Sequence, residues 1–188
     1  SFRPKPFELS LSTNGPGWSE GPDSFTIKDS PIEIKAITFR GYSFSHWSGD
    51  IEFLSDPNDA NTSIEWNSTS NFPSQHLSLT ANFNPEIYSL KVQPQQGGNV
   101  DPFLEGNFSI FQDSNGSYEI NASSETRIIL SSISSTGWSF SRWTSNQEII
   151  DFDPNSSTVI FYPIAESTEE IIYYTAEFSP LEYNSSEV

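Results

Sequence analysis

Apolar and polar residues alternate along much of the chain. A period of two is typical of half-buried β-strands, and it predicts strands near residues 7–11, 25–27, 32–36 and 77–83. A further short strand is predicted at 64–66. Apolar residues nowhere recur at the spacing of an amphipathic helix over two or more turns. The pattern therefore predicts a mainly β structure with little helix.

Two blocks of the sequence are repeated. Residues 41–50 read Gly-Tyr-Ser-Phe-Ser-His-Trp-Ser-Gly-Asp, and residues 137–145 read Gly-Trp-Ser-Phe-Ser-Arg-Trp-Thr-Ser. A Thr-Ala-x-Phe block follows at 80–83 and again at 175–178. The tryptophans shared by the first blocks are 96 positions apart, and the threonines of the second blocks are 95 apart. Two blocks in the same order at nearly the same spacing predict two copies of one folding unit.

The repeat divides the chain into an N-terminal arm, two repeat domains and a tail. The predicted bounds are 1–6, 7–85, 86–181 and 182–188. The copies differ most at 107–120, where the second copy has extra residues around Asp-Ser-Asn-Gly, which is a hairpin signal. Aromatic residues make up 14% of the chain, and their large rings let a small domain close a core.

The first repeated block predicts an irregular strand. Phe44 and Trp47 are three positions apart and would point to opposite faces of a regular strand. A β-bulge between them would let both side chains reach the core.

Composition narrows the classes of partner. Eight basic residues stand against twenty-five acidic ones, for a net charge of -17, which disfavours binding to nucleic acids and anionic membranes. Cysteine is absent, so the chain has no disulfide or thiol chemistry. Methionine is absent too, which predicts a processed product or a piece of a longer chain. With no signal-peptide core and no apolar run long enough to cross a bilayer, this segment is expected to be soluble.

The repeated blocks resemble the divergent internalin-type B-repeat, also called the bacterial repeat domain, which occurs in tandem in large bacterial surface and secreted proteins. The first copy carries the family pattern at Gly41, Tyr42, Phe44, Trp47, Ser48, Gly49, Asp50, Thr80, Ala81 and Phe83. The second copy keeps the aromatic positions but has Thr144-Ser145-Asn146 in place of Ser-Gly-Asp. The resemblance covers about 7–180 and implies a small mainly β module, either β-grasp-like or a small β-sandwich.

No catalytic centre is predicted. An acyl-transfer triad needs a nucleophile, a base and an orienting group held together, and the chain offers only His46 and His76 as histidine bases. Arg142 occupies the position of His46 in the second copy. Two histidines without cysteine also fall short of a zinc site. We therefore expect that the protein is not an enzyme.

Calcium is the one metal that the sequence favours, because hard cations take oxygen ligands. Asp151, Asp153 and Asn155 have the spacing of the first three ligands of a calcium loop, but Ser156 replaces the turn glycine and Tyr162 the bidentate glutamate. A looser acidic cluster lies in the first copy at Asp50, Glu52, Asp56 and Asp59. Solvated acidic turns are the alternative interpretation of both clusters, and no other cofactor is expected.

Two tryptophans, Trp18 and Trp66, lie outside the repeated blocks. Exposed aromatic rings stack on the apolar faces of ligands such as sugars, so both are candidates for glycan binding. The alternative is that they pack in the core or against a hairpin.

These features and the resemblance predict a non-enzymatic, extracellular repeat module that acts as a stalk, spacer or adhesive segment of a bacterial surface protein. Its partners would be neighbouring domains of a larger protein or copies of itself. One alternative is a carbohydrate-binding module. Another is a self-assembling filament subunit, in which the arm at 1–6 or an unpaired edge strand adds to a neighbour's sheet.

Overall fold

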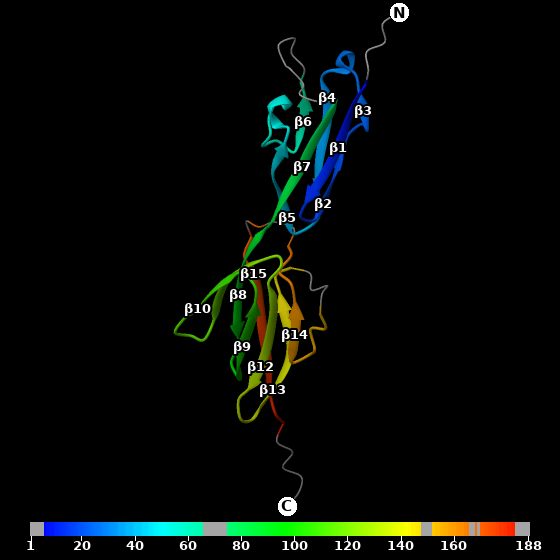
Figure 1. Cartoon of the computed structure of the whole chain (residues 1–188). Helices are drawn as coiled ribbons and strands as arrows, with labels where there is room; N and C mark the ends of the chain where they lie inside the picture. Colours follow the sequence, from blue (N-terminus) through cyan, green and yellow to red (C-terminus); the bar gives the residue numbers. More distant parts are fainter. Residues whose placement is uncertain (1–5, 66–74, 148–151, 166–167, 169, 183–188) are drawn as a thin grey trace, which may run out of the picture. The chain divides into compact units, whose positions relative to one another are not determined.

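The computed structural model describes residues 6–65, 75–147, 152–165, 168 and 170–182. It divides into two compact units, Ser1–Pro85 and Glu86–Val188 (Figure 1). Most of the predicted arm and tail lies outside the described residues, as do the glycan candidate Trp66 and the calcium candidate Asp151.

The first unit is a sandwich of two β-sheets. The larger sheet has the strand order β3-β1-β7-β5, and the smaller has the order β2-β4-β6. The strands are β1 (Phe7–Asn14), β2 (Gly17–Glu20), β3 (Ser24–Phe25), β4 (Ile32–Thr38), β5 (Tyr42–Gly49), β6 (Asn61–Ile64) and β7 (His76–Pro85). Two short 3-10 turns, η1 (Ile27–Asp29) and η2 (Ile51–Phe53), are the helical elements of the described chain.

The second unit repeats this plan with one added strand. Its sheets have the orders β10-β11-β8-β15-β13 and β14-β12-β9. The strands are β8 (Ile87–Pro94), β9 (Gly98–Glu105), β10 (Phe108–Gln112), β11 (Tyr118–Ser123), β12 (Arg127–Ser134), β13 (Trp138–Ser145), β14 (Thr158–Phe161) and β15 (Ile172–Pro180). The extra strand β10 pairs with β11 around the predicted turn, so the hairpin prediction is confirmed.

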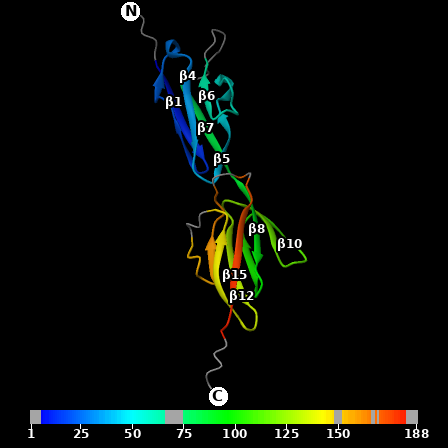
Figure 2. The same cartoon turned by 180° about the vertical axis from the view of Figure 1, so that it is seen from behind.

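In each unit the first strand pairs with the last one, and the pair is parallel. β1 lies beside β7 and β8 beside β15 (Figure 2). The prediction of a mainly β structure is confirmed. Two arrangements were predicted, a β-grasp-like fold and a small β-sandwich, and the structure is a β-sandwich. A β-grasp fold packs its sheet against an α-helix, and the described chain has none.

Each unit has its own core between its two sheets, built by alternating inward residues. In the first unit, Leu9 on β1 and Leu79 on β7 meet Ile34 of the facing sheet. In the second unit, Leu90 and Leu130 meet in the same way. Each copy therefore has a hydrophobic core made of its own residues.

The strand predictions needed correction at three places. The strand predicted at 25–27 ends at Phe25, because Ile27 begins the 3-10 turn η1. The predicted strand at 64–66 lies earlier, at Asn61–Ile64, because its buried positions are Thr62 and Ile64 and a polar residue in the core hid the alternation. The strand β2 was missed, since its glycine reads as a turn. Gly17 is needed there because a Cβ would lie 2.6 Å from the ring of Phe83.

Candidate functional site

The repeated blocks form the same aromatic cluster in both units. In the first unit, the Phe44 ring lies 5.9 Å from Trp47 and 6.1 Å from Phe83, measured between centroids. The matching distances in the second unit are 5.7 and 6.0 Å. Both tryptophans, Trp47 and Trp143, are 1% exposed. The family pattern is therefore a core motif, replicated closely in both copies.

The predicted bulge in the repeated strand is confirmed. The pairing of β5 with β7 shifts register between Phe44 and His46. The pairing of β13 with β15 shifts between Phe140 and Arg142. A bulge adds one residue to one strand, and it lets the phenylalanine and the tryptophan face the same core.

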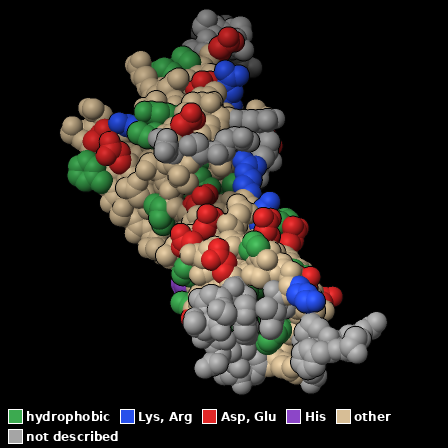
Figure 3. Space-filling view, turned by 90° about the horizontal axis from the view of Figure 1, so that it is seen from above, with side chains coloured by type: hydrophobic (Ala, Val, Ile, Leu, Met, Phe, Trp, Pro, Cys, Tyr) green, Lys and Arg blue, Asp and Glu red, His purple; other side chains and the backbone are tan. Residues whose placement is uncertain are grey.

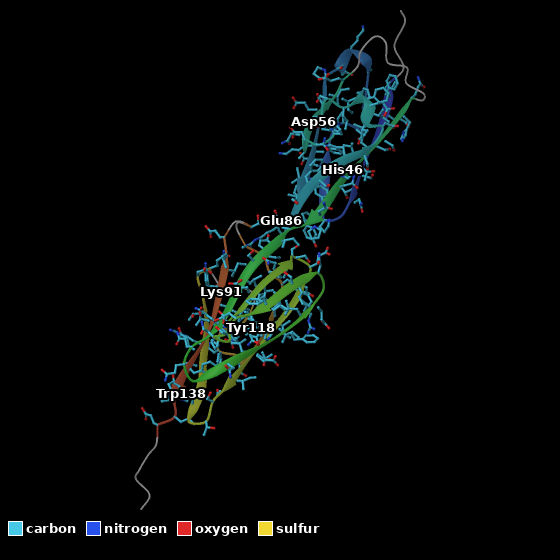
Figure 4. The ribbon with its side chains drawn as sticks, turned by 90° about the vertical axis from the view of Figure 1, so that its left-hand side faces the viewer. His46, Asp56, Glu86, Lys91, Tyr118 and Trp138 are labelled. Atoms are coloured by element: carbon cyan, nitrogen blue, oxygen red, sulfur yellow. The ribbon has the colours of Figure 1, made fainter. Side chains whose placement is uncertain are left out.

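In the first unit, the buried tryptophan is anchored to an Asp-Pro-Asn turn. The Trp47 backbone N–H donates to the Pro57 carbonyl at 2.7 Å, and its indole Nε1 donates to the Asp59 carbonyl at 3.1 Å. The Asp56 carboxylate closes the turn by accepting the Asn58 backbone N–H at 2.8 Å. Figure 4 labels Asp56 in this unit.

The second unit repeats the anchor. Trp143 donates from its backbone to the Pro154 carbonyl at 2.7 Å and from Nε1 to the Ser156 carbonyl at 3.0 Å. Asp153 Oδ1 accepts the Asn155 backbone N–H at 2.9 Å. Two of the calcium candidates, Asp153 and Asn155, thus form the turn that holds a core tryptophan. The signal that sequence reasoning missed was the same tripeptide, Asp-Pro-Asn, which begins 9 positions after Trp47 and 10 positions after Trp143.

The acidic cluster of the first unit has similar structural roles. Asp59 Oδ1 accepts the Asn61 backbone N–H at 2.9 Å, and Asp50 Oδ2 accepts that of Ser78 at 2.8 Å. Among the described residues, no group of three or more histidine or acidic side chains is placed to hold a metal ion. Calcium binding stays a prediction, since Asp151 is not described.

The substitution of Asn146 for the motif aspartate conserves a hydrogen bond. Asn146 Oδ1 accepts the Tyr173 backbone N–H at 2.8 Å, which matches the bond from Ser78 to Asp50. Asn146 Nδ2 also donates to the Ile171 carbonyl at 2.9 Å. The motif position therefore ties the end of the repeated strand to the closing strand, and a neutral amide does this as well as a carboxylate.

Both histidines have exposed side chains on different strands. His46 projects from β5, where Nδ1 lies 3.0 Å from Ser45 Oγ (Figure 4). His76 Nδ1 lies 3.6 Å from a Glu8 carboxylate oxygen. The Arg142 side chain, at the position of His46 in the second copy, donates to Glu177 at 2.8 Å. The structure therefore does not bring the two histidines together.

The glycan candidate Trp18 lies on the outer face of the smaller sheet and is 43% exposed. Its ring is 5.6 Å from that of Phe39, and its Nε1 donates to Glu20 at 3.1 Å. A hollow of about 450 Å³ adjoins Glu20 and is lined by polar groups that include Lys35 and Asn61. Glycan binding at Trp18 stays a prediction.

The chain has twenty-five acidic residues and eight basic ones. Figure 3 shows Asp and Glu side chains scattered over one face, with Lys and Arg side chains between them. In the second unit, Lys91, Arg127 and Arg142 each pair with a glutamate, at 3.5, 2.7 and 2.8 Å. Exposed pairs add little stability. They do neutralise the basic groups of this unit.

The comparisons with known proteins agree with the repeated core motif. A family model described as the divergent InlB B-repeat domain matches residues 8–87 and 88–180. No curated protein and no solved structure matches the chain. Within the described residues, no helix has the length and apolar character to pass through a membrane. The chain belongs to the divergent InlB B-repeat domain family, with two tandem copies of the domain.

Proposed function

We propose that this pair of domains is a non-enzymatic spacer in an extracellular surface protein, and that it carries mechanical load between neighbouring domains. The family is typically associated with bacterial surface proteins. A spacer needs domains that stay folded when tension is applied to their ends. The topology of each copy supports this role.

The observation that carries the proposal is the parallel pairing of the terminal strands. In the first unit, β1 and β7 pair in register from Glu8 opposite His76 to Asn14 opposite Asn82. Tension enters at the start of β1 and leaves at the end of β7. Because the strands are parallel, these points lie at opposite ends of the pair. The hydrogen bonds between them are then loaded together in shear instead of one after another.

Side chains reinforce this seam. Ser12 Oγ lies 2.7 Å from Thr80 Oγ1, and Asn14 Nδ2 donates to Asn82 Oδ1 at 3.0 Å. In the second unit, Gln93 Nε2 donates across the equivalent seam to a hydroxyl of β15 at 3.1 Å. Cross-strand pairs of this kind add to the ladder of backbone bonds.

The junction between the copies is short in sequence. β7 ends at Pro85 and β8 begins at Ile87, which leaves Glu86 alone between them. Glu86 is bound within the second unit, where its carboxylate accepts the Tyr88 hydroxyl at 2.7 Å and its carbonyl accepts the Ser124 N–H at 2.8 Å (Figure 4). Load would pass from one terminal strand to the next through very few residues.

Single-molecule force spectroscopy tests the proposal on the full chain. Handles at the two chain ends load both seams in shear. Handles at cysteines introduced as N14C and N82C load the β1–β7 pair of the first unit at one end, so that its bonds break in sequence. We expect the first unit to unfold at a clearly higher force in the end-to-end geometry. Equal forces in the two geometries would refute a load-bearing role for the seam.

The Trp18 surface supports a second candidate function, the binding of glycans. The ring is exposed beside Phe39, and Glu20, which accepts its Nε1–H, lines a hollow with several polar residues. Titration with soluble chitin and glucan oligosaccharides should quench tryptophan fluorescence, and W18A should remove the response. F103A, which deletes an exposed ring in the second unit, is the matched control. A response that persists in W18A would exclude this surface.

A further inference from the structure

Strand β10 is an edge strand with an exposed apolar sequence. It reads Phe-Ser-Ile-Phe-Gln and has no charged residue and no proline. Its three apolar side chains, Phe108, Ile110 and Phe111, are 40%, 40% and 65% exposed. Phe108 and Ile110 lie opposite Ala122 and Ile120, which are each 1% exposed. The side chains of β10 on the core-facing side are therefore exposed, whereas those of β11 beside them are buried.

The other edge strands of the described chain carry protection against pairing. β3 has two residues, and β2, β6 and β14 have four each. β5 and β13 are bulged, and the Asp-Pro-Asn turns occupy an N–H on each. β9 contains Pro102 and the acidic residues Asp101 and Glu105. Short strands, bulges, proline and charge are the usual devices that protect sheet edges. β10, with five residues, is longer than β2, β3, β6 and β14 and has no bulge, proline or charge.

The hydrogen-bonding groups of β10 alternate between its neighbour and the open edge. Ser123 N–H donates to the Asn107 carbonyl, and Asp113 N–H donates to that of Ser117. These bonds flank the strand and fix the alternation of the antiparallel ladder. Ser109 and Phe111 therefore bond toward β11. The N–H and C=O groups of residues 108, 110 and 112 point away from it.

We propose that β10 pairs with β10 of a second copy of this chain, antiparallel and about a two-fold axis at Ile110. In this register, Ile110 faces its own copy, and Phe108 faces Gln112 of the second copy. All of these residues have outward N–H and C=O groups. On the opposite face, Phe111 meets Ser109. Each phenylalanine thus meets a smaller or more flexible side chain, so the strand is complementary to itself.

The β10 edge is a place where a second copy can pair without bringing charged side chains together. The chain has a net charge of -17, so association through most of its surface would bring acidic groups together. Pairing through β10 places only uncharged side chains in the seam, because the strand carries none with charge. A two-fold contact of this kind closes on itself. The product is a dimer that joins two spacers side by side, which goes beyond the spacer function of one chain.

Analytical ultracentrifugation of the full chain tests the dimer. We expect a concentration-dependent dimer that I110P weakens by at least about tenfold, because proline removes an N–H that donates in the seam. The substitution should leave the fold intact, since this N–H faces away from the sheet. I110K, which would place like charges opposite each other, should have the same effect. I133K changes another exposed isoleucine and should leave the dimer unchanged.

Cross-linking gives a second readout. The chain has no cysteine, so I110C introduces a single thiol beside the proposed axis, and I133C introduces one away from it. A short bismaleimide should capture the I110C dimer and not the I133C one. A chain that stays monomeric up to millimolar concentration would overturn the proposal, as would a dimer that survives both I110P and I110K. A dimer lost on deletion of residues 1–6 but kept in I110P would assign the seam to the arm instead.

Discussion

The two copies agree in their cores and differ on their surfaces. The aromatic cluster, the bulge and the tryptophan anchor recur with nearly equal geometry. The outer face of the smaller sheet does not: Glu33 and Ser63 in the first copy become Ile129 and Ile160 in the second. The edges of the larger sheets differ as well. The two-residue strand β3 pairs with β1 in the first copy, whereas the β10–β11 hairpin pairs with β8 in the second.

This difference separates positions that maintain the fold from positions free to acquire a function. What both copies share has a packing or hydrogen-bonding reason in each. What only one copy has, such as Trp18 or β10, is not required by the fold. The surfaces proposed for glycan binding and for dimerisation both belong to this second class.

The largest expected effect tests whether the two anchors are equivalent. Trp47→Ala and Trp143→Ala each remove a side chain that is 1% exposed, and each should destabilise its own unit by about 3–5 kcal/mol. Amide hydrogen exchange, measured at increasing denaturant concentration, should show loss of protection in the mutated unit alone. Loss in both units from one substitution would contradict the independence of the two cores.

The next effect concerns a local difference within the motif. Gly49 has φ of +102°, and a Cβ there would collide with the Ser78 carbonyl oxygen. The second copy has Ser145 at this position, and no described non-glycine residue has a positive φ. Gly49→Ala should therefore cost about 1–3 kcal/mol, whereas Ser145→Gly should cost less than about 1 kcal/mol. Thermal unfolding of both variants measures the contrast, and similar costs would contradict it.

A reciprocal exchange tests the strand tie at the end of the motif. Asp50→Asn keeps an acceptor for the Ser78 N–H and should change stability by less than about 0.5 kcal/mol. Asn146→Asp keeps the bond from Tyr173 but loses the one to the Ile171 carbonyl, and it should cost about 1–2 kcal/mol. Urea midpoints give both values. An equally large loss in Asp50→Asn would mean that the charge itself is needed.

The smallest expected effect is a pH dependence of stability. It should arise in the connection before β4 of the first unit and not in the matching connection before β12 of the second. The Thr26 backbone N–H and the Thr26 hydroxyl both donate to the Asp29 carboxylate. These bonds lower the pKa of Asp29, and the backbone bond has the larger effect. A folded pKa below the unfolded one stabilises the first unit above the unfolded value, about 3.9. This contribution is lost as the pH falls through the folded pKa. In the second unit, the neutral Thr126 hydroxyl donates to the Asn107 carbonyl instead.

Urea unfolding of wild type and Asp29→Asn at neutral and acidic pH checks this effect. The variant should be less stable near neutral pH, and the difference should shrink in acid. Thr126→Ala is the control in the second unit, since it removes a hydroxyl that does not titrate. A difference for Asp29→Asn that stays constant with pH would contradict the role of the carboxylate.

Local patterns in the sequence determined the fold class, the two copies and most strands. Alternation is a property of neighbouring residues, and self-similarity needs no knowledge of contacts. The bulge also followed, since two large aromatic residues at a spacing of three demand it. All of these predictions depend only on the order of residues along the chain.

Only the tertiary structure decided what the polar residues do. Asp153 is a calcium candidate in the sequence, and only the structure shows that its carboxylate accepts the Asn155 N–H in the turn whose Pro154 carbonyl accepts the Trp143 N–H. Gly17 reads as a turn, although it belongs to a strand that lies against Phe83. The edge of β10 is open because β11 and the rest of the sheet lie on one side of it and no described strand lies on the other. Such roles depend on which distant segments become neighbours, and no local periodicity encodes that.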